Sequence, residues 1–500
     1  MSAATQQPFQ TPQAVLDGDL SEKSYRAILT CITLVAAFVR FWHLESRGFI
    51  IDEGYSWAIA RAPLHSFLHD LVTNTSEMPL HYIVLRYWSL LGTSEFVMRS
   101  LSVIFATATV PVIAEVGKGL YSRRAGLFAA ALFATQVVGI KFSQEIRTYP
   151  MVMLFAAFGW FQLTNVVRDP SRRNWFWFSL ISIATIYSHL IGGLNVAAQF
   201  ATLLFLPVSR LGWRKLGESA LAIFLGIFPA IVFTLHHTTD VAWIHPTDLT
   251  ILREFAANLS GRFDLTMLAL LPWIAFLVVT ALFAITWRRV GIGPDLWAAS
   301  VPVFGTVVPF LLLLAVSHYK PLFIPRYIAY VLIPFLIGLG WVFSRLKPVW
   351  STGLAVAFAV MFAAQLPSYY REPAWMDFRG GVAYVGSRHQ AGDALVVWEP
   401  MARPAVEYYG SRVKDFPDFI FPKSGDRFHA EDMFMRPDPY TLPSVFAQRK
   451  RIWIIFDLDK SPEEYTVVPP LYFEHVISRT HKQVSFKQFK NVRVEEFVRR

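Results

Sequence analysis

Long apolar runs, separated by short basic turns, constrain this 500-residue chain more than any other feature. A helix needs about 17–25 mostly apolar residues to cross a bilayer. Runs of this kind occupy residues 27–44, 97–117, 125–141, 150–167, 175–190, 192–208, 218–236, 265–286, 297–317, 329–344 and 349–366. They predict an all-α polytopic membrane domain over residues 27–366 with about eleven spans, several of them short, so that their boundaries are soft.

The composition agrees with this class. Charged residues make up 16% of the chain and mean hydropathy is +0.39, whereas soluble domains carry about 25% charged residues. The net charge of +10 alone would suggest nucleic acid. The basic residues, however, lie in short clusters between apolar runs, where they fix membrane orientation. We therefore expect no nucleic-acid partner.

The basic clusters predict the topology. They occupy residues 121–124, 168–173, 210–215, 288–289 and 345–347. If each run crosses once, all five lie on the same side as the polar tail 1–26, which has no evident cleavage site. The positive-inside rule then places the N-terminus in the cytoplasm and the first span stays in the mature protein.

The remaining segments are predicted to lie outside. Residues 45–96 and 237–264 form outer loops. The stretch 79–92, which carries His81 and Arg86, is too short for a span and predicts an interfacial or re-entrant helix. Apolar residues between Tyr55 and Leu71 recur at helical spacing and predict an amphipathic interfacial helix.

Residues 367–500 differ in character and predict a small extracytoplasmic α/β domain. Residues 393–398 and 451–456 are short apolar runs bounded by turn or charged residues, which is typical of buried strands. Residues 381–390 and 404–409 predict helices.

Ionisable residues gather where the predicted spans leave the membrane on the outer side. Asp52 and Glu53 follow the first run, Glu145 and Arg147 follow the third, and Lys320, Arg326 and Tyr327 precede the tenth. Charges so close to hydrocarbon are costly and are usually functional. The competing interpretation is ordinary loop charge with snorkelling side chains.

These segments resemble a known family. Asp52-Glu53 resembles the acidic motif of C-type glycosyltransferases, which are integral membrane enzymes. Residues 142–149, FSQEIRTY, are similar to the YSQEARxY string of the bacterial branch related to protein O-mannosyltransferases and the lipid A aminoarabinose transferase. Residues 94–100 and 325–327 match that branch too. The resemblance covers roughly residues 27–366 and, more faintly, 375–409.

The resemblance implies an inverting transferase at the bacterial plasma membrane. Its donor would be a polyprenyl-phosphate sugar, with mannose as one candidate. Its acceptor would be a hydroxyl or amine of a glycan, lipid or protein on the outer face, and an acid in the first outer loop would be the base. One departure is residues 77–82, EMPLHY, because relatives often have HPPLYY there. Glu77 thus adds a third outer acid.

The chemistry assigns roles to these residues. A phosphate leaving group has a last pKa of about 6 and needs positive charge rather than a general acid. Arg147, Lys320, Arg326 and Tyr327 are the predicted donor-phosphate ligands, and Arg offers a planar fork for phosphate oxygens. The acceptor hydroxyl needs a positioned base. Asp52 is the first candidate and Glu53 the next, while Glu145 would orient the acceptor or hold a cation.

Further substrate contacts are predicted for Tyr55, Glu77, His81, Arg99, Gln144 and Tyr149. For Arg99 the alternative is an ion pair with Glu95, four residues earlier in the same helix. No cofactor is required, although Asp52, Glu145 and Glu77 offer oxygen ligands suited to Mg²⁺ or Mn²⁺. His236, His237 and Asp240 match no zinc spacing.

Other functions compete with a sugar transferase. A lipid or polysaccharide transporter would carry ionisable groups near the bilayer midplane, in repeated halves. A polysaccharide-export scaffold would not need Asp52 or Glu145. A polymerase of lipid-linked oligosaccharides differs from a monosaccharide transferase only in its donor.

Overall fold

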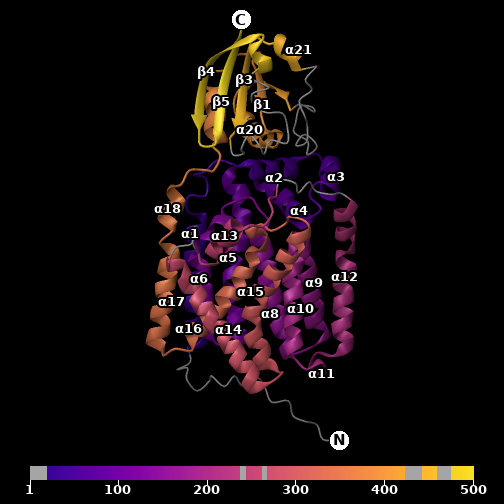
Figure 1. The fold of residues 1–500 in the computed structure, drawn as a ribbon, viewed down its shortest axis with the longest axis vertical. Helices are drawn as coiled ribbons and strands as arrows, with labels where there is room; N and C mark the ends of the chain where they lie inside the picture. Colours follow the sequence, from indigo (N-terminus) through magenta and orange to yellow (C-terminus); the bar gives the residue numbers. More distant parts are fainter. Residues whose placement is uncertain (1–19, 237–243, 262–266, 423–441, 459–474) are drawn as a thin grey trace. The chain divides into compact units, whose positions relative to one another are not determined.

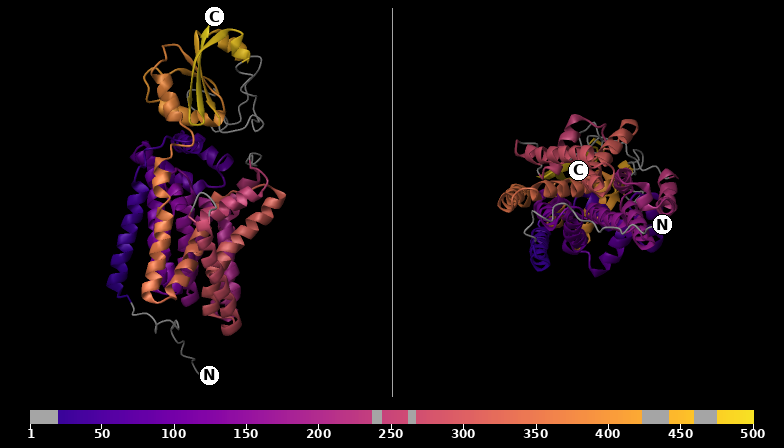
Figure 2. Two further views of the ribbon diagram at one scale, coloured as in Figure 1. Left: turned by 60° about the vertical axis from the view of Figure 1, so that its left-hand side comes forward. Right: turned by 90° about the horizontal axis from the view of Figure 1, so that it is seen from below.

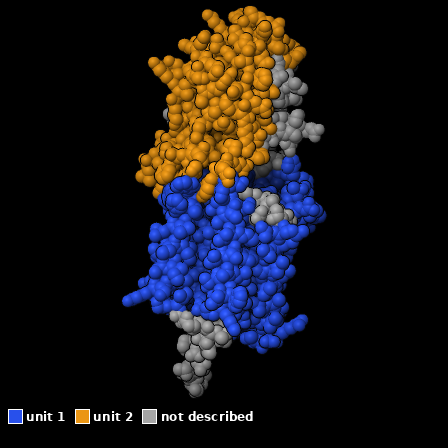
Figure 3. Space-filling model, turned by 90° about the vertical axis from the view of Figure 1, so that its left-hand side faces the viewer, with its two compact units in different colours: residues 1–42, 76–81, 100–369 blue, residues 43–75, 82–99, 370–500 orange. Residues whose placement is uncertain are grey.

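The computed structural model describes residues 20–236, 244–261, 267–422, 442–458 and 475–500. These residues form two compact units, coloured in Figure 3. The first unit comprises residues 1–42, 76–81 and 100–369. The second comprises residues 43–75, 82–99 and 370–500, so the first outer loop groups with the C-terminal domain.

In the described part of the chain, eight helical segments are long and apolar enough to cross a membrane. They contain α1 (Glu22–Phe41), α5 (Glu95–Leu120), α8 (Tyr149–Arg168), α12 (Trp213–His236), α14 (Leu270–Val290), α15 (Pro294–Tyr319), α16 (Leu332–Ser344) and α17 (Pro348–Ala363). In Figures 1 and 2 the long helices of the first unit lie side by side. The predicted polytopic helical class is confirmed, and the protein is an integral membrane protein.

The other three apolar runs also form helices, but these are broken or shorter. They are α6 (Arg123–Thr135) with α7 (Val137–Ser143), α9 (Arg172–Ser188), and α10 (Gly193–Thr202) flanked by η2 (Leu190–Gly192) and η3 (Leu203–Phe205). The chain bends by 62° between α6 and α7, where the sequence predicts one continuous run. The count of about eleven spans therefore stays a prediction.

The basic clusters meet at one end of the first unit. Arg123 donates to the carbonyl of Leu20, Arg168 to that of Gly119, and the Lys215 ammonium to that of Pro170 at 2.6 Å. Three clusters and the start of α1 thus share one end of the bundle, as the predicted topology requires. Which compartment that end faces stays a prediction.

The first outer loop contains two helices where the sequence predicts one. α2 (Ile51–Arg61) ends before Pro63, which is the N-cap of α3 (Leu64–Thr73). The break has a local cause, since proline lacks the N–H that a continuing helix would need. α4 (Pro79–Trp88) follows with 10 residues. At 1.5 Å per residue it is about 15 Å long, half of what a span needs.

Short elements complete the connections. They are η1 (Ser89–Leu91), α11 (Val208–Leu211), α13 (Leu249–Leu259), η4 (Met267–Ala269), η5 (Pro325–Val331) and α18 (Leu366–Arg371). The predicted outer loop 237–264 is described only over 244–261, where α13 lies. Residues 1–19 of the predicted tail, as well as His237 and Asp240, lie outside the described residues.

The C-terminal domain is a five-stranded mixed sheet of order β2-β1-β3-β5-β4. Its strands are β1 (Ala394–Val397), β2 (Asp418–Phe421), β3 (Arg451–Asp457), β4 (His481–Phe489) and β5 (Val492–Arg499). β1 pairs in parallel with β2 and β3, and the hairpin β4–β5 adds antiparallel to β3. Its helices are α19 (Phe378–Gly386), α20 (Arg403–Gly410), α21 (Leu442–Ala447) and the turn η6 (Pro400–Ala402).

Both predicted strands and both predicted helices are present, but the predicted helix 381–390 ends at Gly386, and residues 387–390 are not helical. Apolar side chains fill both faces of the sheet, with Leu395 and Trp453 on one and Val396 and Ile454 on the other. α21 packs on the second face, and α19 and α20 pack on the first. This α/β fold agrees with the predicted class.

Candidate functional site

Two groups of polar residues hold the predicted site residues, one in each unit. In the first unit, the break between α6 and α7 positions the segment that follows α7. Arg40 of α1 is fully buried and donates to the carbonyls of Phe133 and Ala134, at 3.0 and 3.1 Å. These carbonyls end α6 and have no partner further along the helix. A guanidinium also suits the negative end of the helix dipole.

Gln136 begins the second half of the broken helix. Its side-chain oxygen accepts from the backbone N–H of Gly139, and its amide nitrogen donates to the carbonyl of Asn258. Arg40 and Gln136 therefore satisfy the backbone groups that the bend would otherwise leave unpaired in an apolar surrounding.

Gln144, at the end of α7, ties this segment to two other helices. Its amide nitrogen donates to the carbonyls of Arg40 and Trp42, at 2.9 and 2.8 Å. Its oxygen accepts from the Tyr369 hydroxyl at 3.0 Å. Both amide hydrogens are thus used within the protein, which favours a structural role over the predicted substrate contact.

Arg147 lies two residues beyond Glu145. Its guanidinium donates to the Tyr149 hydroxyl at 3.2 Å and lies 5.6 Å from the centre of the Tyr149 ring. Thr148 fixes the backbone between them by donating to the carbonyl of Ser188 at 2.6 Å. The start of α8 and the end of α9 are therefore held together beside Arg147.

The turn before α4 reaches the same place. The carbonyl of Glu77 accepts from the N–H of Leu190 at 2.8 Å. Among the described residues, the buried Oε2 of Glu77 makes no hydrogen bond. Burial raises the pKa of Glu77 to about 7, although its own backbone and Arg147 act in the opposite direction. Near neutral pH this carboxyl is therefore shared between its two protonation states.

Two histidines flank Arg147. His189 follows α9 and His81 lies in the first turn of α4, and both are buried. Burial lowers the pKa of each to about 3, and the Arg147 guanidinium acts in the same direction. Both imidazoles are therefore neutral at physiological pH.

η5 completes the group. The ring of Tyr327 lies 5.0 Å from that of His189, which also stacks on Tyr149 at 6.4 Å. Arg326 is close enough to His189 to help lower its pKa. We call this group the polar cluster; its members are Glu77, His81, Arg147, Tyr149, His189, Arg326 and Tyr327.

Six members of the polar cluster are predicted site residues, and His189 is the one that sequence reasoning missed. Its only signal is a histidine near the end of the apolar run 175–190. Lys320 ends α15, is exposed, and its side chain makes no hydrogen bond or ion pair with any described residue. Glu145 is part-buried and its carbonyl accepts from the N–H of Arg147.

In the second unit, Glu53 and Arg99 form a buried ion pair. Arg99 Nε and Nη2 each donate to one carboxylate oxygen of Glu53 at 2.7 Å. The predicted alternative, a pair between Arg99 and Glu95, is therefore wrong. Glu95 instead accepts from Arg379 and from the Tyr409 hydroxyl.

Arg99 also fixes the chain that leads into α2. Its guanidinium donates to the carbonyls of Leu44, Arg47 and Gly48 at 2.7–3.2 Å. Glu53 in turn accepts from the N–H of Ile50 at 3.3 Å, which closes the start of α2. Asp52 lies in the first turn of the same helix and is part-buried.

The C-terminal domain holds α2 from the side of α20. Gly54 lies against Ala405 so closely that a Cβ would stand 2.5 Å from its backbone nitrogen. The Tyr409 hydroxyl accepts from the N–H of Phe49 at 2.7 Å. Burial, followed by the Glu95 carboxylate, raises the pKa of Tyr409, so its hydroxyl stays protonated. Tyr55, on the same helix, packs edge-on against Tyr82.

A metal site is not among the features of the described ranges: no three His, Cys, Asp or Glu side chains within them are grouped to hold an ion. The predicted oxygen ligands are also divided, because Asp52 belongs to the second unit whereas Glu77 and Glu145 belong to the first.

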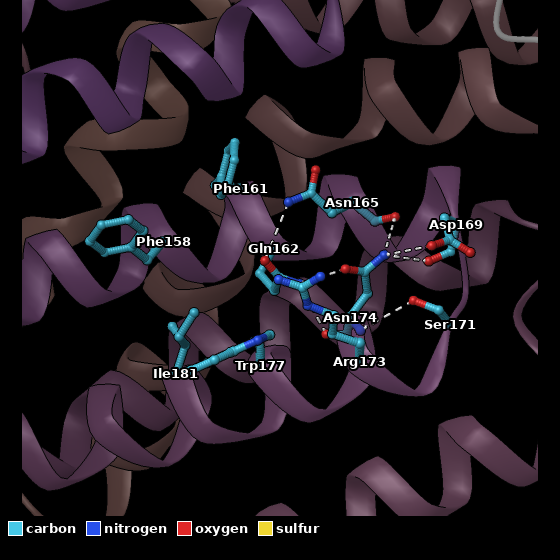
Figure 4. Close-up of a pocket in the computed structure, with 10 residues that line it drawn as sticks. All are labelled: Phe158, Phe161, Gln162, Asn165, Asp169, Ser171, Arg173, Asn174, Trp177 and Ile181. Atoms are coloured by element: carbon cyan, nitrogen blue, oxygen red, sulfur yellow. Dashed lines mark hydrogen bonds between the residues drawn. The ribbon is translucent and has the colours of Figure 1, made fainter.

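A separate hollow of about 440 Å³ lies between α8 and α9 (Figure 4). Asn174 stands at its centre, donating to the Asp169 carboxylate at 3.2 Å and accepting from the Gln162 amide at 3.2 Å. These bonds fasten the turn between the two helices. α8 starts at Tyr149 in the polar cluster and ends beside this hollow, about 30 Å away along 20 residues.

Comparison with known proteins gives matches of fold. No protein-family model and no curated protein matches this sequence. The crystal structure of ArnT from Cupriavidus metallidurans bound to undecaprenyl phosphate is similar at a TM-score of 0.63 and 12% identity, over 95% of this chain and 98% of that one. The same protein in its apo state gives 0.62 and 13%, over the same shares.

A second solved protein shares the fold. The oligosaccharyltransferase of Archaeoglobus fulgidus, tethered to an acceptor peptide, has a TM-score of 0.56 at 10% identity, over 94% of this chain and 74% of that one. The resemblance predicted from the motifs is thereby confirmed for the fold. The chain therefore shares its fold with ArnT, crystallised with undecaprenyl phosphate, and with an oligosaccharyltransferase.

Proposed function

We propose that this protein is an inverting membrane glycosyltransferase, which moves a sugar from a polyprenyl-phosphate donor to an acceptor on the outer face of the membrane. The polar cluster is the observation that carries the proposal. It gathers two guanidiniums, two neutral imidazoles and two tyrosines from four separate segments of a chain with the C-type fold. The similar ArnT was crystallised with undecaprenyl phosphate.

The polar cluster suits a phosphate. Arg147 and Arg326 supply two positive charges, and both histidines stay neutral. When the sugar leaves, negative charge grows on the phosphate oxygens, and fixed cations in a poorly hydrated place stabilise that change. Lys320 is exposed and is kept in the proposal as a cation that could approach once donor is bound.

The proposal assigns the base to Asp52. Both oxygens of the neighbouring Glu53 are bound by Arg99, so Glu53 is committed to holding α2. A carboxylate fixed in that way is a poor proton acceptor, because protonation would break a buried ion pair. Asp52 would take the proton from the acceptor hydroxyl or amine, and Glu145 would orient the acceptor.

Finer features of the proposal rest on the sequence motifs. Mannose is the first donor sugar to test, because residues 142–149 resemble the string of the branch related to protein O-mannosyltransferases. The acceptor would be a glycan, lipid or protein outside a bacterial plasma membrane. Mg²⁺ or Mn²⁺ is not required by this scheme, since the two guanidiniums already face the phosphate.

The test is transfer of radiolabelled sugar from polyprenyl-phosphate mannose in membranes that contain the protein. Asp52→Asn should lower the rate by about 100- to 10,000-fold, the usual contribution of a positioned base. Asp295→Asn is the matched control, because Asp295 also lies in a helix's first turn and is exposed. Transfer at the parent rate by Asp52→Asn would remove Asp52 from this role. Products that carry many sugars per transfer would indicate the polymerase instead.

A further inference from the structure

His189 is held in one tautomer. Its Nδ1 accepts a hydrogen bond from the backbone N–H of Ile191 at 3.2 Å, as the N-cap of η2. A neutral imidazole has one donor and one acceptor nitrogen. Because Nδ1 accepts, the ring hydrogen must be on Nε2.

The Nε2–H of His189 makes no hydrogen bond to any described residue. The side chain as a whole is 4% exposed, but Nε2 is not among the described buried polar atoms that lack a partner. Nε2 therefore keeps a small exposed area in a residue that is otherwise buried. A donor without a protein partner, in a side chain that is otherwise buried, calls for a partner such as a ligand or an ordered water.

The surroundings select an anion as that ligand. Among the described residues, Arg147, Arg326 and His81 interact electrostatically with His189, and the Glu77 carboxyl interacts with Arg147. The rings against His189 belong to Tyr149 and Tyr327. Glu77 contributes a backbone carbonyl through Leu190. Two guanidiniums beside a neutral N–H donor would together bind phosphate oxygens, which only accept hydrogen bonds when ionised.

We propose that the Nε2–H of His189 donates a hydrogen bond to the phosphate of the lipid-linked donor, as a substrate-binding residue beside Arg147 and Arg326. This inference rests on the proposed function. The ring adds a directional contact without adding a positive charge or an acidic proton. It therefore binds the leaving phosphate but does not protonate it.

The two nitrogens of His189 can be separated by substitution. His189→Asn keeps an oxygen where Nδ1 accepts from Ile191, and Asn is a good N-cap residue, so the turn should survive. It removes the donor at Nε2. His189→Gln places an amide N–H near the position of Nε2 and restores the donor. Thermal unfolding of both variants in detergent shows whether the turn is intact.

The experiment measures binding of undecaprenyl phosphate to the full-length protein in nanodiscs, with inorganic phosphate as a separate ligand. A hydrogen bond to a charged group is worth about 1.5–3 kcal/mol, so His189→Asn should weaken lipid-phosphate binding roughly 10- to 100-fold. His189→Gln should stay within about threefold of the parent. Equal weakening by both variants, or by neither, would overturn the inference. If His189→Asn weakened the binding of inorganic phosphate but not that of undecaprenyl phosphate, the inference would also be overturned, because the bound phosphate would not be that of the lipid.

A pH series tests the neutral state. Burial and the two guanidiniums hold the pKa of His189 near 3. The ratio of the dissociation constants of His189→Asn and the parent for undecaprenyl phosphate should therefore be constant from pH 6 to pH 8. A ratio that grows below pH 6.5 would show that an imidazolium carries the affinity. The binding assay needs no sugar transfer. A parent that transfers sugar but binds lipid phosphate independently of residue 189 would overturn only this inference, whereas a parent that binds no lipid phosphate would overturn the proposed function too.

Discussion

Arg99 binds both carboxylate oxygens of Glu53, each at 2.7 Å, with both side chains 3% exposed or less. This pair distinguishes two acids that are adjacent in the sequence. Glu53 holds Arg99, and Arg99 in turn donates to three backbone carbonyls of the loop before α2. The ion pair therefore fixes both this loop and the start of α2. Asp52, one residue earlier, is then carried in the first turn of a fixed helix.

Removing one partner of this ion pair should strongly destabilise the protein. Glu53→Gln or Arg99→Gln leaves a buried charge without its partner, which typically costs about 3–5 kcal/mol of the free energy of unfolding. Chemical unfolding in detergent micelles measures it. Arg26→Gln is the control, because its ion pair with Glu22 is exposed and should contribute nothing measurable. If Glu53→Gln and Arg99→Gln both left the free energy of unfolding unchanged, the ion pair would not hold α2.

Gly54→Ala should loosen α2 from the C-terminal domain. The added Cβ would meet the backbone nitrogen of Ala405 at 2.5 Å, and backbone atoms cannot turn aside as a side chain can. We expect a lower unfolding temperature and faster proteolysis of the first outer loop. Gly353→Ala is matched, since Gly353 is also helical and a Cβ there meets nothing within 4 Å. It should be neutral or stabilising by up to about 1 kcal/mol, because Ala favours helix over Gly. A similar response of both variants would contradict the close approach.

The helices could be predicted from the sequence because apolar length is a local signal. The bend at Gln136 could not be, since it depends on Arg40, which reaches the last carbonyls of α6 from a distant helix. The partner of Arg99 was mispredicted for a similar reason. Helical spacing suggested Glu95, but the guanidinium turns to a carboxylate of another segment.

In the C-terminal domain, the buried strands β1 and β3 were predicted from apolar runs, whereas the hairpin β4–β5 was not. β4 lies at the sheet edge and most of its side chains are exposed, so it has no apolar run to mark it. Its turn is marked only by Asn491, whose φ of 50° suits a tight hairpin.

The candidate site was predicted in residue type more than in role. Arg147, Arg326, Tyr149, Tyr327, Glu77 and His81 were all named as site residues, and they do lie together. His189 was missed because its importance comes from its neighbours, Tyr149 and Tyr327, which are remote in sequence. A single sequence carries no signal for such packing.

Glu77 should make the stability of the protein depend on pH. Burial raises its pKa to about 7, above the usual value of 4.5. The folded state therefore holds the proton more tightly than the unfolded chain. The resulting stabilisation is fully present below about pH 4.5 and is lost as the pH rises through about 7. It amounts to at most about 3.5 kcal/mol, at 1.4 kcal/mol per pKa unit. Unfolding of the parent and of Glu77→Gln at several pH values should show the parent losing stability relative to the variant between these limits.

The same proton should control phosphate binding by the polar cluster. Below pH 7 Glu77 is mostly neutral, whereas above pH 7 its carboxylate offsets part of the positive charge of Arg147. His81 and His189, with pKa values of about 3, do not titrate in this range. Parent and Glu77→Gln should therefore bind undecaprenyl phosphate alike at pH 6, whereas at pH 8 the parent should bind more weakly. Comparing the two proteins at each pH cancels the titration of the phosphate itself, whose last pKa is about 6. If the difference in affinity for undecaprenyl phosphate between the parent and Glu77→Gln were the same at every pH, Glu77 would not exchange its proton beside Arg147.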